Sequence, residues 1–329
     1  MKINFKVTTK CPANCLCCQE RLANFEMFNN EEAEISKIFE KILALFKAKG
    51  DKENHLSITG GEPTLVIDLP KYVKKLVENN ISVGIDTNGW NITEEWLNTM
   101  EKAGLKYILL SVYSLKKDTY EYLRGSDNGE LFERMKNAIS ILKKYKEEGG
   151  SIEVRLQTVL MKPNYKELPD ILELSILSGF DTLSTAYYIA LDADERLLMD
   201  QNDIKIFVDK IEIEMISIIK RYVSDNSLVE KNINKIYSFF KFDSVSLENV
   251  AQGKYRENNC GERNRVAIYP NGVVAPCLGF DYYMDEKNTL NIMADDTLDV
   301  FGKFTEFWNK DYIMCTRCSS GYQIWLELS

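Results

Sequence analysis

The chain has 329 residues, of which 45% are apolar, enough for one large domain and a small one. Its net charge of −9 disfavours nucleic acid or an anionic membrane as the main partner. A run of about 18 apolar residues and an N-terminal signal-peptide core are both missing, so we expect a cytoplasmic protein without a membrane-spanning helix.

Residues 1 to about 190 alternate between strand-like apolar runs and amphipathic, helix-like segments. Strands are predicted at 3–8, 55–59, 81–86, 106–113, 152–161 and 182–190, and helices at 31–49, 69–79, 93–103, 130–147 and 165–178. This alternation implies parallel strands joined by helical crossovers. Six such units predict an α/β fold, a partial (β/α)6 TIM-like barrel, with functional residues after the strand C-termini.

The second part of the chain has a different pattern. Residues 200–241 carry one apolar face, which includes Phe207, Val208 and Met215, and are predicted to be helical. Asn271-Gly272 between apolar residues predicts a β-hairpin. We therefore divide the chain into a core barrel (1–195), a helical connector (196–255) and a small C-terminal α+β domain (256–329).

The eight cysteines fall into two groups, at 11, 15, 17 and 18 and at 260, 277, 315 and 318. Disulfides are disfavoured in the cytoplasm, so this clustering indicates metal or iron-sulfur binding. Cys11, Cys15 and Cys18 follow the first predicted strand directly. Three thiolates leave one iron of a four-iron cluster open, although a zinc or ferredoxin fragment is the alternative for this motif taken alone.

The three-cysteine spacing resembles the signature of the radical S-adenosylmethionine (SAM) superfamily. Turns after the next three strands resemble that family too: Thr59-Gly60-Gly61-Glu62-Pro63, Asp86-Thr87-Asn88-Gly89, and Ser111-Val112-Tyr113-Ser114 with Arg124-Gly125. The resemblance implies a 4Fe-4S cluster on Cys11, Cys15 and Cys18, with SAM at its open iron. It further implies that SAM is contacted by Gly60, Gly61, Glu62, Asn88, Ser111 and Arg124.

Cys17 departs from the family pattern, in which an aromatic residue is common at this position. We interpret Cys17 as a small apolar substitute, while a misassigned ligand and a hydrogen donor stay open as alternatives. The lone histidine, His55, is interpreted as structural.

The second cysteine group, Cys260, Cys277, Cys315 and Cys318, can close either a zinc site or an iron-sulfur cubane. The residues around it resemble the C-terminal domain of the SPASM/twitch-type subfamilies. Because the chain has four such cysteines, the resemblance implies the twitch type, with one auxiliary 4Fe-4S cluster that carries electrons.

The resemblance implies an oxidoreductase that reductively cleaves SAM to a 5′-deoxyadenosyl radical and abstracts a substrate hydrogen. We expect oxidative modification of a ribosomally made peptide, by crosslinking or side-chain oxidation, as in many members of the subfamily. Dehydrogenation of a small molecule such as an aminosugar, peptide epimerisation, and a non-catalytic two-cluster electron carrier are the alternatives. The expected partners are a low-potential electron donor (flavodoxin or ferredoxin) and, for a peptide, a separate leader-binding protein.

Overall fold

The computed structural model describes residues 1–18, 34–51, 53–126, 128–188, 195–239, 265–276, 290–293, 302 and 323–329, and every structural statement concerns these residues alone. The chain divides into two units. The first comprises Met1–Asn14, Cys18–Leu109 and Glu262–Lys310, and the second comprises Cys15–Cys17, Leu110–Gly261 and Asp311–Ser329.

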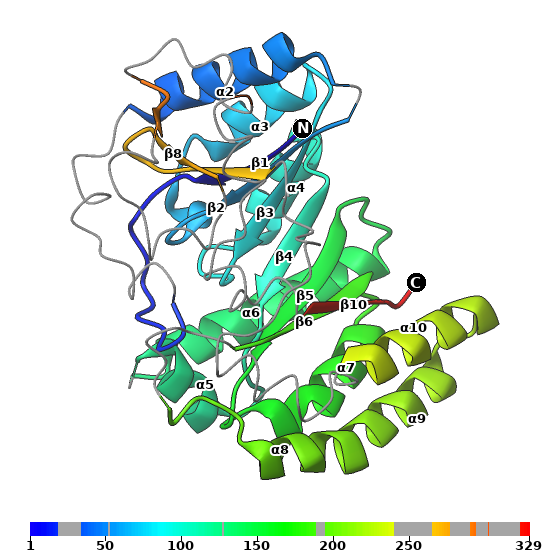
Figure 1. Cartoon of the computed structure of the whole chain (residues 1–329). Coiled ribbons are helices and arrows are strands. Elements are labelled where there is room, and N and C mark those ends of the chain that lie inside the picture. The colour runs from blue at the N-terminus through cyan, green and yellow to red at the C-terminus, as the bar shows by residue number, and fades with distance from the viewer. Residues whose placement is uncertain are drawn as a thin grey trace. The chain divides into compact units, whose positions relative to one another are not determined.

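The first unit contains three parallel strands that follow one another in the chain (Figure 1). These are β1 (Lys2–Lys6), β2 (Asn54–Thr59) and β3 (Ile81–Thr87). β1 pairs with β2 from Lys2↔His55 to Lys6↔Thr59, and β2 pairs with β3 from Asn54↔Ile81 to Ile58↔Ile85. Because all three run in the same direction, their C-terminal ends, and the turns that follow them, meet at one edge of the sheet.

Helices cover these strands through apolar faces at helical spacing. They are α2 (Ile35–Lys49), α3 (Leu69–Val77) and α4 (Glu94–Ala103), with a short 3-10 turn at Pro63–Leu65. The Phe39 ring of α2 meets Phe5 of β1 edge-on at 5.0 Å and stacks on Tyr72 of α3 at 4.4 Å. The predicted periodicity of this part of the chain therefore corresponds to real packing.

The predicted hairpin at Asn271-Gly272 is confirmed. β7 (Arg265–Ile268) and β8 (Val273–Ala275) are antiparallel, with Ala267 opposite Ala275, and β9 (Leu290–Asn291) pairs with β8. Gly272 adopts a φ of +83°, which the turn requires and which side chains disfavour. β7 also pairs in parallel with β1, so the hairpin extends the sheet of the first unit.

The second unit contains β5 (Glu153–Leu160) and β6 (Thr182–Tyr187), which are parallel, and β10 (Gln323–Glu327), which is antiparallel to β6. Its helices include α5 (Lys117–Arg124), α6 (Glu130–Glu147) and α7 (Leu168–Leu177). β4 (Tyr107–Ser111) begins in the first unit and ends in the second. The sequence predicted neither α5, which has only eight residues, nor β10.

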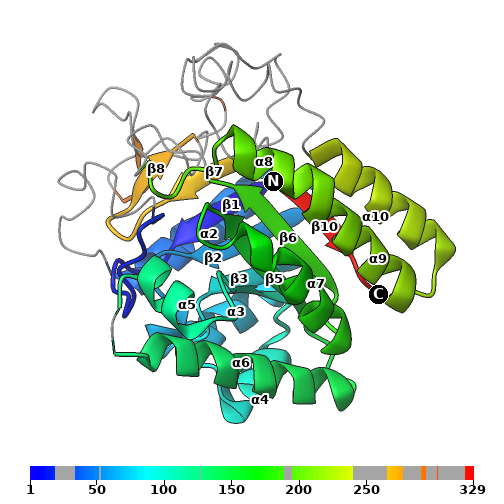
Figure 2. The ribbon, with the colours of Figure 1, turned by 90° about the horizontal axis from the view of Figure 1, so that it is seen from below.

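The predicted helical connector is interrupted. It consists of α8 (Gln201–Ile206), a π-helical turn (Phe207–Ile211), α9 (Glu212–Tyr222) and α10 (Asn226–Phe239). Figure 2 shows α9 and α10 side by side. The carboxylate of Asp225 accepts hydrogen bonds from the first backbone amides of α10 and so starts a new helix.

One residue of the predicted apolar face is not buried. Val208 is exposed, whereas Phe207, Ile211 and Met215 are buried as expected. A π-turn accommodates an extra residue, which shifts the helical phase that a uniform period assumes.

The six predicted strands are all present, with ends that differ by a few residues, so the α/β class with parallel strands is confirmed. In the part of the chain that the structure describes, no helix is both long and apolar enough to span a membrane.

Candidate functional site

The turn after β2 is bound by its backbone to the segment that leads into Cys11. Gly61 N donates to Thr8 O (2.7 Å) and Glu62 N donates to Lys10 O (2.8 Å). A Cβ on Gly61 would collide with the carbonyl of Lys10, and one on Gly60, whose φ is +129°, would lie 2.6 Å from Thr8 O. The two glycines therefore permit a close approach of two backbone segments.

Glu62 is fully buried and its carboxylate joins the turns after β2 and β3. One oxygen accepts from Thr64 N (2.9 Å), Thr64 Oγ1 (2.6 Å) and Thr87 Oγ1 (2.6 Å), and the other accepts from Asn88 N (2.8 Å). A buried carboxylate needs such donors to offset its lost hydration. The side chain is thus committed to internal hydrogen bonds, and the expected contact of this turn with SAM stays a prediction.

Asn88 connects the hydrogen-bond network of Glu62 to the first cysteine, Cys11. Its side-chain amide donates to Cys11 Sγ at 3.6 Å, and its Oδ1 accepts from Trp90 N at 3.0 Å. Amide donors to a cysteine sulfur favour the thiolate form that binds metal. The first unit therefore brings together Gly60, Gly61, Glu62 and Asn88, four of the predicted residues, with Cys11.

In the second unit, Arg124 at the end of α5 contacts the second cysteine. Arg124 Nη1 donates to Cys15 Sγ at 3.3 Å, and Nη2 donates to the carbonyl oxygen of Ser111 at 2.7 Å. Leu16 N also donates to Leu123 O at 2.9 Å, which fixes the cysteine loop against α5. The second unit therefore brings Ser111 and Arg124 together with Cys15.

Two tyrosine rings enclose the Arg124 guanidinium, Tyr113 at 4.1 Å and Tyr120 at 5.2 Å. Burial alone would lower the pKa of Arg124, but Tyr120, Cys15 and Tyr113 outweigh it and hold this pKa well above its usual value. Burial, reinforced by the neighbouring Cys17, raises the pKa of Tyr113 well above the ordinary value. Arg124 is therefore charged and Tyr113 neutral near pH 7, and Cys17 is buried as a hydrogen-bond partner of Tyr113.

The predicted cluster ligands share one loop but differ in exposure: Cys11 is exposed, Cys15 is buried and Cys18 is intermediate, and none of the three is in a disulfide bond with a described residue. The structure gathers no preformed group of three Cys, His, Asp or Glu side chains among its described residues. The chemistry nevertheless fits an anionic iron-sulfur group. Two of the sulfurs receive N–H donors, and the buried Nε of Arg124 has no hydrogen-bond partner among the described residues, which leaves a donor for a ligand.

The second cysteine group cannot be placed in the same way. Cys260, Cys277, Cys315 and Cys318 lie outside the described residues.

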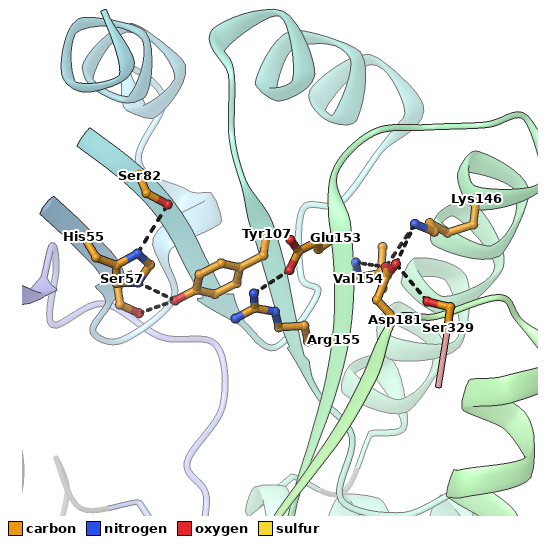
Figure 3. A network of polar contacts seen from close by, with 10 residues as sticks. All are labelled: His55, Ser57, Ser82, Tyr107, Lys146, Glu153, Val154, Arg155, Asp181 and Ser329. Atoms are coloured by element: carbon orange, nitrogen blue, oxygen red, sulfur yellow. Dashed lines mark hydrogen bonds and ion pairs between the residues drawn. The ribbon is translucent and has the colours of Figure 1, made fainter. Parts of the chain in front are cut away.

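Polar networks link the strands of each unit (Figure 3). In the first unit, His55 stacks on Tyr107 (5.6 Å between ring centroids), and its ring nitrogens contact Ser82 Oγ and Tyr107 OH. In the second unit, Asp181 accepts hydrogen bonds from Val154 N and Lys146 and so joins β5 to α6. The packing of His55 agrees with its interpretation as a structural residue.

Sequence reasoning assigned no supporting role to several residues of the site, although Thr87 stands within one of the turns that resemble the family. Thr64 and Thr87 complete the Glu62 network, and Tyr120 covers Arg124. A signal for Tyr120 was present, because residues four apart on a helix share a face and a Tyr-Arg pair at this spacing favours a cation–π contact. This signal can be used only if the segment is known to be a helix, and the pattern of alternating strands and helices did not reveal α5.

Curated proteins similar to this chain include GTP 3′,8-cyclases. The enzyme of Clostridium botulinum is 27% identical over 295 residues, covering 87% of this chain and 85% of the relative. That of Nautilia profundicola is 25% identical (88% and 84% covered), and that of Helicobacter pylori is 26% identical (88% and 83% covered).

Solved structures share the fold at lower identity. SuiB of Streptococcus suis bound to S-adenosylmethionine gives a TM-score of 0.64 at 18% identity, covering 97% of this chain and 70% of that one. The enzyme anSMEcpe with bound AdoMet gives 0.63 at 16% identity, covering 100% and 88%. The predicted partial TIM-like α/β fold is thereby confirmed.

The expected oxidative modification of a ribosomal peptide is wrong. It relied on analogy with a subfamily rich in peptide-modifying enzymes, and it is overturned by relatives that are GTP 3′,8-cyclases over most of the chain. Fold similarity to SuiB does not restore it, since proteins with one fold act on different substrates.

The radical SAM sequence profile matches residues 5–175, more than half of the chain. This range includes the three-cysteine loop and the turns after β2, β3 and β4. The family implies an enzyme with a 4Fe-4S cluster and SAM, and the donors around Cys11 and Cys15 suit such a group. This chain belongs to the radical SAM superfamily.

Proposed function

We propose that this enzyme binds its 4Fe-4S cluster through Cys11, Cys15 and Cys18 and acts on a purine nucleotide, with GTP as the first candidate. The cluster assignment is supported chiefly by the N–H donors on the sulfurs of Cys11 and Cys15. The substrate assignment is supported by the GTP 3′,8-cyclases, which align over 87–88% of this chain. With cluster and SAM bound, the cofactors supply a 5′-deoxyadenosyl radical that removes a hydrogen atom from the substrate.

The described residues would then have defined tasks. Asn88 and Arg124 stabilise the thiolates of Cys11 and Cys15. Gly60, Gly61 and Glu62 keep the turn after β2 against the segment that enters the cysteine loop. Ser111 orients Arg124 through its carbonyl oxygen.

On the proposed substrate, loss of the hydrogen at C3′ of GTP precedes a bond between C3′ and C8 of the base, and the radical that this leaves on the base must then take up one electron and one proton. That bond is the one named in the relatives. Any residue that contacts the nucleotide lies beyond what the described contacts support, so none is assigned.

The proposal extends to the remaining parts of the chain. The division into 1–195, 196–255 and 256–329 would place one auxiliary 4Fe-4S cluster on the four C-terminal cysteines. A flavodoxin or ferredoxin would supply the electron that reduces the SAM-binding cluster. A cytoplasmic location suits cysteines such as Cys11, Cys15, Cys17 and Cys18, which are not in disulfide bonds with described residues, because a reducing compartment preserves thiols.

Isotope transfer tests the substrate. Anaerobically reconstituted full-length protein is mixed with dithionite, SAM and GTP carrying deuterium at C3′, and the products are separated by mass spectrometry. We expect one deuterium in 5′-deoxyadenosine together with a cyclised product of GTP. Cys18→Ala should yield neither, and ATP serves as the control nucleotide.

The outcomes separate the two levels of the proposal. SAM cleavage without deuterium transfer or GTP product would remove the nucleotide and keep the cluster assignment. Iron binding and SAM cleavage that are unchanged in Cys18→Ala would remove the three-cysteine ligand set. A second measurement, the iron content of the protein lacking Cys315 and Cys318, tests the auxiliary cluster, because about four of eight irons should be lost.

A further inference from the structure

Arg124 has a buried position that an ordinary helix-terminal arginine does not need. Arg124 is the last residue of α5, and a cation at a helix C-terminus is favourable even when it is exposed on the surface. The Arg124 side chain is nevertheless buried. Its two terminal nitrogens are both used, one on Cys15 Sγ at 3.3 Å and one on Ser111 O at 2.7 Å. A planar guanidinium spans these acceptors in a fixed geometry, so it fixes the Cys15 side chain relative to the end of β4.

The environment keeps this cation charged and poorly screened. The rings of Tyr113 and Tyr120 lie over it at 4.1 and 5.2 Å and exclude water from its faces. A charge in such a low-dielectric setting acts on its neighbours more strongly than a charge on the surface does. The guanidinium donates directly to Cys15 Sγ, which becomes a thiolate when it binds iron.

Hydrogen bonds to the sulfurs of an iron-sulfur cluster are among the factors that set its reduction potential. Reduction by one electron adds a negative charge to the cluster, and a buried cation beside a ligand sulfur stabilises that charge. We propose that Arg124 is a positioning residue that orients Cys15 and raises the reduction potential of the SAM-binding cluster. This inference depends on the proposed cluster at Cys11, Cys15 and Cys18, and it does not depend on the substrate.

The role differs from the one that family resemblance implies, in which Arg124 contacts SAM. A SAM contact predicts weaker SAM binding in a variant and an unchanged potential when SAM is absent. A sulfur contact predicts instead that the reduction potential of the cluster changes in the variant even when SAM is absent. The two roles are therefore separable by one measurement on the cluster alone and one on SAM binding.

The test compares Arg124→Gln, Arg124→Lys and the control Arg134→Gln in the full-length, reconstituted protein. Arg134 is half-exposed on α6 and pairs with Glu130, so its replacement removes a guanidinium from the surface. Iron content is measured first, and then the midpoint potential of the cluster by EPR-monitored titration without SAM or GTP. SAM affinity is measured separately by equilibrium binding.

We expect Arg124→Gln to shift the potential of the SAM-binding cluster to more negative values, and Arg124→Lys, which keeps the charge, to lie between it and the wild type. Arg134→Gln should leave the potential unchanged. If Arg124→Gln binds no iron, the midpoint potential of Arg124→Lys is compared with that of Arg134→Gln instead. Potentials of the Arg124 variants equal to that of Arg134→Gln would overturn the inference. Wild-type protein that binds no four-iron cluster would instead refute the proposed function.

Discussion

Cys11 and Cys15 belong to one short loop, yet each unit surrounds its cysteine with a different kind of donor. Cys11 receives a neutral amide from Asn88, which follows β3 and is itself held by Glu62. Cys15 receives a charged guanidinium from Arg124, which ends α5 and lies between two aromatic rings. The first arrangement is a chain of backbone and side-chain hydrogen bonds, and the second is a buried cation.

The difference suggests a division of tasks. The network around Cys11 ties three loop segments together, so its members should matter most for folding and for cluster assembly. The cation near Cys15 involves few hydrogen bonds, so its members should matter most for the electronic properties of a bound cluster. Substitutions in the two regions test this division, from the largest expected effect to the smallest.

Glu62→Gln should have the largest effect on stability. The substitution replaces one acceptor oxygen with an amino group that faces donors, in a fully buried site. We expect the free energy of unfolding to fall by about 3 kcal/mol, since buried donors lose their acceptor. Urea denaturation of the cluster-free protein measures it.

The matched control for this prediction is Glu78→Gln, whose side chain is exposed and pairs with Lys74 only at 3.9 Å. It should change stability by about 0.5 kcal/mol or less. Equal effects of the two substitutions would contradict the bracing role of Glu62.

Gly61→Ala should come next. Its new methyl group would collide with the carbonyl of Lys10 and push the turn after β2 away from the segment that enters the cysteine loop. We expect a loss of about 2 kcal/mol, typical of overpacking, together with reduced iron content after reconstitution. Thermal unfolding and iron analysis measure the two effects.

Gly149→Ala separates crowding from backbone strain. Gly149 has a φ of +83°, and among the described residues other than its chain neighbours no atom lies within 4 Å of the position that a methyl group would take there, so only strain is introduced. It should cost about 1 kcal/mol and leave the iron content intact. If Gly149→Ala also lost iron, the iron content would reflect only the stability of the protein and not the position of the turn after β2.

The sequence predicted the first of these two arrangements better than the second. Thr59–Pro63 and Asp86–Gly89 are short motifs next to predicted strand ends, so the strand pattern located them once the family resemblance had marked their residues. What Glu62 contacts could not be predicted, because its partners Thr64 and Thr87 are ordinary residues whose role depends on tertiary packing.

Arg124 shows more clearly what could not be predicted from the sequence. Family resemblance marked the residue, but its burial follows from α5, a helix of eight residues whose apolar face is too short to produce a clear period. Its partner Cys15 is distant in the chain, and no local pattern reports a contact of that kind. The substrate was mispredicted for a related reason, since nothing in the motifs that bind SAM specifies what the radical attacks.

Asn88→Ala should shift the reduction potential of the SAM-binding cluster less than Arg124→Gln does. Both remove a donor to a ligand sulfur, but the Asn88 contact is longer, 3.6 Å against 3.3 Å, and carries no charge. Charge-assisted hydrogen bonds are roughly twice as strong as neutral ones. EPR-monitored titration of the two variants measures the order, and the reverse order would refute the contrast between the two cysteines.

Tyr113→Phe should have the smallest effect, because the ring that faces Arg124 at 4.1 Å is retained and only the hydroxyl is lost. Tyr113→Leu removes the aromatic face and should move the potential in the same direction as Arg124→Gln, since a cation–π contact of about 2 kcal/mol in a desolvated site no longer holds the guanidinium. The hydroxyl is a partner of Cys17 and is neutral because burial raises its pKa, so its loss removes no charge near Cys15. Redox titration of both variants therefore distinguishes the ring from the hydroxyl. A shift in Tyr113→Phe as large as that in Tyr113→Leu would assign the effect to Cys17 and its hydrogen bond, and the buried cation would no longer account for the difference between the two units.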